Sequence, residues 1–104
     1  MELNNPRIYI LVRSDLSLGQ KAVQSCHALI ELSNQCRLEP HPTVIVLSIS
    51  SEQRLWQEMR RVLSHGLETY PFYEPDLDES LTAFAVLVRS LSEEKVFRPY
   101  QLLK

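Results

Sequence analysis

Residues 7–31, RIYILVRSDLSLGQKAVQSCHALIE, decide the fold. The segment begins with an apolar, β-branched run that ends at Arg13, and such a run is typical of a strand covered on both faces. A polar loop follows, and then residues recur at helical spacing with polar residues opposite them. The positions that we expect to face the core are Ala22, Cys26, Leu29, Ile30 and Ser33. The segment therefore predicts a strand, a loop and a helix in succession.

Three later stretches predict further strands. Residues 43–49 and 82–88 are nearly continuous apolar runs of the same kind as the first. Residues 67–73 are shorter and contain Pro71, which has no amide proton to donate to a sheet, so we expect them at a sheet edge.

Two further helices are predicted between and after these strands. Residues 50–53 form a candidate capping box, and Gly66 suits the position just past the end of the helix. The core stripe expected for this helix is Leu55, Met59, Val62 and Leu63. Residues 92–97 predict a short last helix.

The order β-α-β-α-β-β predicts an α/β protein, built as a three-layer α/β/α sandwich around a small mixed sheet of four strands. Because the first two strands flank a helix, we expect them to be parallel with a right-handed crossover. The residues expected in the sheet core are Leu11, Val44, Val46, Phe84 and Val86.

Composition narrows the class of protein. The chain has 104 residues, of which 44% are hydrophobic, so residues 1–104 are expected to form a single domain. The net charge of −2 excludes a broad positive field for nucleic acid, so any such contact must be local. No apolar run is long enough to span a membrane and the first residues lack an apolar leader, so we expect a cytoplasmic protein with no membrane partner.

The two cysteines, Cys26 and Cys36, are ten residues apart, which is about 15 Å along a helix axis. That separation exceeds the reach of a disulfide, so free thiols are expected. Without a Cys-x-x-Cys motif or a Cys/His cluster, neither a metal site nor a cofactor is predicted.

A candidate site lies where the first helix opens at the end of the first strand. Ligands of open α/β sheets bind at such edges, and the free amides of a helix N-terminus favour anions. Gln20, Gln24, His27 and Glu31 follow helical spacing and share one face, while Arg13 and Lys21 supply charge. The ordinary interpretation stays open for each, because polar residues on a helix are most often simply solvated.

The run V-R-S-D-L over residues 12–16, then Gly19, then A-V-Q-S-C-H-A over residues 22–28 resembles the signature of type 2 peptidyl-tRNA hydrolases. The resemblance continues weakly through Thr82 and the Leu-Leu-Lys end of the chain. It implies a small mixed sheet with helices on both faces, a homodimer, and the tRNA 3′ end as partner.

The resemblance also implies roles for single residues. The resemblance implies catalytic roles for Gln24 and His27, and Asp76 is the acidic residue in the neighbourhood of the family's catalytic Asp, so it is the third catalytic candidate. The candidate substrate- or phosphate-binding residues are Gly19, Gln20 and Thr82, together with Arg13 and Lys21 for their charge. The implied reaction is attack of water on the ester between a peptidyl group and the tRNA 3′ ribose, which needs no metal.

Two departures from the family pattern keep a second interpretation open. Gln20 stands where the family has its key lysine, and no D-A-G segment precedes the last core strand. The alternative is a catalytically altered binding or regulatory module on the same fold, which recognises an anionic ligand or a protein partner. A different hydrolase or transferase acting at the same edge is a third interpretation, which nothing in the sequence favours.

Overall fold

Five strands form one mixed, strongly curled sheet in this computed structural model, which describes residues 2–103. The spatial order of the strands is β3-β4-β1-β2-β5. Their bounds are β1 (Glu2–Arg13), β2 (Thr43–Ile49), β3 (Tyr70–Glu74), β4 (Ser80–Ser90) and β5 (Gln101–Leu102). The predicted α/β class is confirmed. The predicted count of four strands is wrong by one, because β5 has only two residues and leaves no periodic signal in the sequence.

The pairing of the strands places β1 at the centre. It pairs in parallel with β2, where Leu11 lies opposite Leu47, and antiparallel with β4, where Leu11 lies opposite Phe84. The parallel arrangement of the first two strands is therefore as predicted. β3 lies at one edge of the sheet, as the proline within it predicts.

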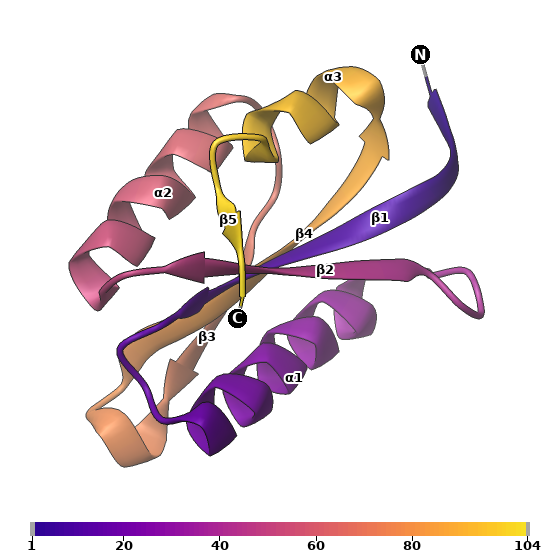
Figure 1. Cartoon of the computed structure of the whole chain (residues 1–104). Coiled ribbons are helices and arrows are strands. Elements are labelled where there is room, and N and C mark those ends of the chain that lie inside the picture. The colour runs from indigo at the N-terminus through magenta and orange to yellow at the C-terminus, as the bar shows by residue number, and fades with distance from the viewer. Residues whose placement is uncertain (1, 104) are drawn as a thin grey trace.

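Helices cover the two faces of this sheet (Figure 1). α1 (Leu18–Gln35) packs on one face, while α2 (Glu52–Ser64) and the short α3 (Leu91–Glu94) lie on the other. Two 3-10 turns complete the chain, η1 (Pro75–Leu77) between β3 and β4, and η2 (Lys95–Phe97) after α3.

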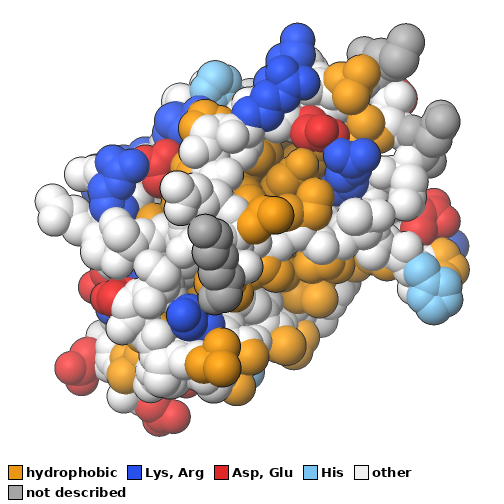
Figure 2. Space-filling model, in the orientation of Figure 1, with side chains coloured by type: hydrophobic (Ala, Val, Ile, Leu, Met, Phe, Trp, Pro, Cys, Tyr) orange, Lys and Arg blue, Asp and Glu red, His pale blue; other side chains and the backbone are white. Residues whose placement is uncertain are grey.

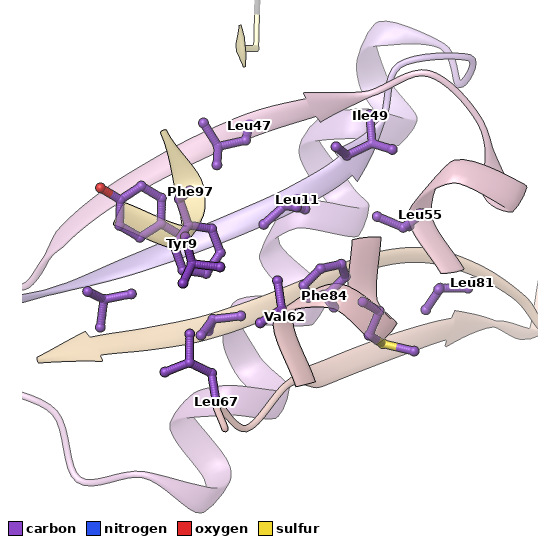
Figure 3. Packing of buried hydrophobic residues seen from close by; sticks show 14 residues of the cluster. Tyr9, Leu11, Leu47, Ile49, Leu55, Val62, Leu67, Leu81, Phe84 and Phe97 are labelled. Carbon is purple, nitrogen blue, oxygen red and sulfur yellow. The ribbon is translucent and has the colours of Figure 1, made fainter. Parts of the chain in front are cut away.

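Each face of the sheet has its own core. On the α2 side, Leu11 and Phe84 pack against Leu55 and Val62 (Figure 3). On the α1 side, Ile8, Ile10 and Val12 pack against the helix. Because successive side chains of a strand point to opposite faces, β1 supplies both cores and must be apolar throughout.

Three of the five residues predicted for the sheet core, Leu11, Phe84 and Val86, are fully buried. Val46 is partly buried, and Val44 is 40% exposed, which corrects its predicted place. The reason is that β5 pairs only with Leu47 and Ser48 and so leaves the beginning of β2 uncovered.

The predicted core stripe of α1 is wrong except at Leu29, which is partly buried against the core. The residues that α1 buries are Gln24, Ser25, Ala28 and Leu32. By contrast, Ala22, Cys26, Ile30 and Ser33 face solvent. The helix has small and apolar residues on two faces, so hydrophobic periodicity alone selects the wrong one.

The ends of both long helices are capped. The reciprocal capping box is in α1, where Ser17 Oγ accepts from the Gln20 amide and Gln20 Oε1 accepts from the Ser17 amide. The box predicted at α2 is not formed, because its N-cap is Ser51, one residue later. Gly66 follows α2 with φ of 81°, a left-handed conformation that glycine adopts without strain, as predicted.

Candidate functional site

A hollow of about 350 Å³ opens beside the N-terminal half of α1. Three separate segments meet there: the first turns of α1, the end of β3, and η1. The lining residues are Gly19, Gln20, Val23, Gln24, Glu74, Asp76 and Leu77. Four of the residues predicted for the site, Gly19, Gln20, Gln24 and Asp76, thus come together, although Asp76 is more than fifty positions from the others.

Gln24 is the buried centre of a hydrogen-bonded chain. Only 2% of it is exposed. Thr82 Oγ1 donates to Gln24 Oε1 over 2.7 Å, and Gln24 Nε2 donates to Glu74 Oε1 over 3.3 Å. Thr82, predicted to bind substrate, therefore lies behind Gln24, a predicted catalytic residue, and holds it in place.

The carboxylate of Glu74 fixes which way the Gln24 amide points. If the amide were turned over, its oxygen would face a carboxylate oxygen, and neither atom can donate a hydrogen bond. With Nε2 held toward Glu74, the second Nε2 proton has no protein acceptor among residues 2–103. Gln24 is one of the residues that line the hollow, so this unpaired proton belongs to a lining side chain.

A β-bulge turns Thr82 toward Gln24. Phe72 pairs with Ala83 and Tyr73 pairs with Leu81, so Thr82 is the extra residue of β4. Without the bulge, strict alternation would place Thr82 on the α2 face with Phe84. Bulges commonly re-aim one side chain at a functional site.

Asp76 reaches the hollow from η1, next to a strained connection. Asp78 and Glu79 have φ of 54° and 58°, a left-handed conformation that non-glycine residues adopt at a cost of about 1–3 kcal/mol each. Their conformation turns the chain from η1 back into β4. The strain thus lies in the segment that presents Asp76.

His27 and Lys21, two other predicted residues, do not line the hollow. The His27 ring stacks on Phe72 of β3, with centroids 4.3 Å apart and an angle of 11° between the planes. The Phe72 carbonyl oxygen lies 3.4 Å from Thr82 Oγ1, whose proton goes to Gln24, so His27 packs on the strand segment next to the Gln24 chain. Lys21 is partly buried on the adjacent turn of α1.

Arg13 lies away from the hollow and is paired. Its guanidinium donates to both carboxylate oxygens of Asp15, each over 2.9 Å, and to the Leu81 carbonyl over 3.3 Å. The hydrogen bonds from Arg13 lower the pKa of Asp15, and those same bonds raise the pKa of Arg13. The paired charges leave little free positive charge for a phosphate.

The described part of the chain contains neither a cluster of metal-binding side chains nor a helix that could span a membrane. No group of three or more His, Cys, Asp or Glu side chains within residues 2–103 converges as metal ligands would. Over that same part, no helix combines the length and the apolarity needed to cross a bilayer.

Comparison with known proteins finds similar solved structures but no family. No family model matches this chain, and no curated protein sequence matches it. A solved structure of a protein of unknown function from Agrobacterium tumefaciens superposes with a TM-score of 0.72. The two chains share 13% identity over 98% of this chain and 100% of the other, so the likeness concerns the fold alone.

Two features of the site were not predicted from the sequence. Glu74 lines the hollow and orients Gln24, yet it is one of several acidic residues in the stretch 74–79 and carries no distinguishing pattern. The bulge at Thr82 depends on how two strands pair, which the sequence of β4 alone does not encode.

Proposed function

We propose that this protein is a cytoplasmic, metal-independent hydrolase that cleaves the ester between a peptidyl group and the tRNA 3′ ribose. In this proposal its fold is the three-layer α/β/α sandwich of the type 2 peptidyl-tRNA hydrolases that its sequence resembles. The observation that carries the proposal is the Gln24 chain. A buried amide, oriented by Thr82 and Glu74 and with one Nε2 proton unpaired, lines a hollow that Asp76 also lines.

The chemistry needs a base for water and a donor for the oxyanion. Asp76 accepts a proton from water as the water oxygen bonds to the ester carbonyl carbon. The carbonyl oxygen becomes negative and takes the hydrogen bond from Gln24 Nε2. The bond from carbon to the ribose oxygen then breaks, and Asp76 returns the proton to that oxygen. The products are a carboxylic acid and a free tRNA 3′ end.

His27 acts in this proposal as a positioning residue for β3, through its stacking on Phe72. His27→Phe keeps a flat ring and removes the imidazole, whereas His27→Ala removes both. Retained turnover in the phenylalanine variant would support the positioning role. Loss of turnover in both variants would assign proton transfer to His27 instead.

The test is release of free tRNA from N-acetyl-aminoacyl-tRNA by purified, nuclease-free protein. Asp76→Asn removes the base, so turnover should fall by about 100-fold or more. Asp78→Asn is the matched control, because Asp78 is an exposed acid of the same loop outside the lining of the hollow. An unchanged rate in the Asp76 variant would refute the role of Asp76.

A second candidate function is a binding module, and the composition of the hollow favours it. Its lining contains two carboxylates and no lysine or arginine. Gln20, at the position of the family lysine, is engaged in the capping box of α1. Such a hollow repels an anionic ligand, so a protein partner or a second copy of this chain suits the module better.

Gln20→Lys separates the two candidates. The substitution places the family's charge at the hollow and removes one capping hydrogen bond, at a cost of about 0.5–1 kcal/mol. A hydrolase that lacks only this charge should become faster. If the wild type and the folded variant are both inactive, the binding module becomes the leading candidate.

A further inference from the structure

We infer that the 3′-terminal nucleotides of the tRNA bind on the opposite face of the sheet from Gln24, in a second hollow along α2. This inference rests on the proposed function and supplies what the first hollow lacks, which is a place for bases and phosphate. The second hollow has a volume of about 520 Å³. It is lined by Glu52, Gln53, Trp56, Gln57 and Arg60.

The residue types in this hollow match those that bind single-stranded nucleic acid. Trp56 packs in part against the core while it lines the hollow, and Tyr73 lies beside it with ring centroids 5.9 Å apart. Bases stack on such rings, because every base has a π-face. Arg60 is exposed on the adjacent turn and has no acidic partner among the described residues, so it is free to contact a phosphate.

The two hollows lie on either side of one edge strand. Glu74 lines the first hollow, and its chain neighbour Tyr73 lies beside Trp56 at the second. β3 is the last strand of the sheet on that side, so a nucleotide chain can pass around it without crossing other strands. A terminal ester at Gln24 and a preceding base at Trp56 are therefore compatible positions on a single strand.

The polar residues of the second hollow favour particular bases. Glu52 is a carboxylate, and one of its oxygens already accepts from the Leu81 amide over 3.0 Å. The remaining carboxylate oxygen accepts from an exocyclic amino group, which cytosine and adenine have and uracil lacks. All tRNAs end in the sequence C-C-A, so these are the bases presented at this end.

Trp56 is the only tryptophan in the chain, and its fluorescence reports binding directly. The experiment is titration of the wild-type protein with the RNA tetranucleotides ACCA and UUUU. We expect saturable quenching by ACCA and at least tenfold weaker binding of UUUU. Absence of quenching by ACCA would overturn the inference, even if the protein hydrolyses N-acetyl-aminoacyl-tRNA.

Variants locate the site by the anisotropy of labelled ACCA. Trp56→Leu should weaken binding by about 5- to 100-fold, while Trp56→Phe keeps a stacking ring and most of the affinity. Arg60→Gln leaves the fold intact, because Arg60 is exposed, and should weaken binding by several-fold. Arg98→Gln, an exposed arginine outside the hollow, is the matched control and should change nothing.

Each outcome bears separately on the two proposals. If ACCA binds with the expected base preference but no ester is cleaved, the inferred nucleotide site stands and the hydrolase proposal fails. If Arg60→Gln and Arg98→Gln bind ACCA equally and Trp56→Leu binds like the wild type, the nucleotides lie elsewhere and the inference is wrong.

Discussion

α1 and α2 cover opposite faces of the same sheet, yet their outer surfaces differ. The exposed residues of α1 include no charged side chain, although the helix is 18 residues long, and Ile30 is 51% exposed. The shorter α2 exposes Arg54 and Arg60. Figure 2 shows the contrast, with hydrophobic side chains over α1 in the lower part of the view and basic ones over α2 at the upper left. An uncharged helix surface suits contact with another protein, whereas a basic one suits water or phosphate.

The inner surfaces of the two helices differ as well. α1 turns the neutral amide of Gln24 inward, where it is hydrogen-bonded beside an open hollow. α2 turns Glu58 inward, and this carboxylate accepts from Arg61 over 3.2 Å and from Tyr100 over 2.6 Å. Arg61 also donates to the Val96 carbonyl, so the network joins α2 to the C-terminal segment. The α1 side therefore keeps a hydrogen-bonding group beside an open hollow, whereas the α2 interior anchors the helix to the C-terminal segment.

The largest effect is expected on the α1 side, at Gln24. Gln24→Ala removes the oxyanion donor, so turnover on N-acetyl-aminoacyl-tRNA should fall by about ten- to a thousandfold. Because Gln24 is buried and its loss leaves the Thr82 hydroxyl without its partner, unfolding in urea should show a loss of about 1–3 kcal/mol as well. Thr82→Ser keeps the hydroxyl and should retain most of the activity. Full activity in Gln24→Ala would remove this residue from the mechanism.

On the α2 side, Glu58→Ala should lower stability without changing the chemistry. It removes the charged acceptor of the partly buried Arg61, which keeps only the Val96 carbonyl and the Tyr100 hydroxyl, and it leaves the Tyr100 proton without its acceptor. The cost should be about 2–3 kcal/mol by urea unfolding. Glu31→Ala on α1 is the matched control, because no ion pair of Glu31 is found within residues 2–103, and it should cost less than about 0.5 kcal/mol. Equal losses in the two variants would contradict the anchoring role of α2.

The same network predicts a pH dependence at alkaline pH. Burial raises the pKa of Tyr100 to about 12, from 10.0. Between these values the unfolded chain loses the Tyr100 phenol proton while the folded chain keeps it. The contribution of Tyr100 to the free energy of unfolding is therefore fully present below about pH 10 and declines toward pH 12. Burial also raises the pKa of Tyr9, so wild type and Tyr100→Phe must be compared. The difference in unfolding free energy between them should shrink across this range, and a constant difference would refute the coupling.

The smallest effect on stability is expected at the outer surface of α1. We expect two copies of the chain to associate through this surface, because its exposed residues carry no charge. Ile30→Lys should shift sedimentation from dimer to monomer while changing the unfolding free energy by less than about 0.5 kcal/mol. Arg60→Ala on α2 should leave the dimer intact. If the wild-type protein sediments as a monomer at high concentration, the expected dimer is wrong.

The sequence predicted more of the fold than of the site. Apolar runs located three of the five strands, because burial on both faces leaves a continuous signal, as in Phe84 and Val86. A fourth, β3, was predicted from a shorter stretch that contains Pro71. The orientation of α1 was not predictable, since Ala28 and Ile30 are equally acceptable core residues and only packing decides between them. At the site, the helical spacing of Gln20 and Gln24 was informative. The contribution of Glu74 depends on strand pairing, which spacing along the chain does not reveal.

The central claim is that chemistry occurs on the α1 face and nucleotide binding on the α2 face. The most direct test measures kcat and KM for N-acetyl-aminoacyl-tRNA with wild type, Asp76→Asn and Arg60→Gln. Both residues are exposed, so both variants should fold. We predict that Asp76→Asn lowers kcat by about 100-fold or more with little change in KM, and that Arg60→Gln raises KM by several-fold at unchanged kcat. No release of tRNA by the wild type, or the same parameter changing in both variants, would contradict the account.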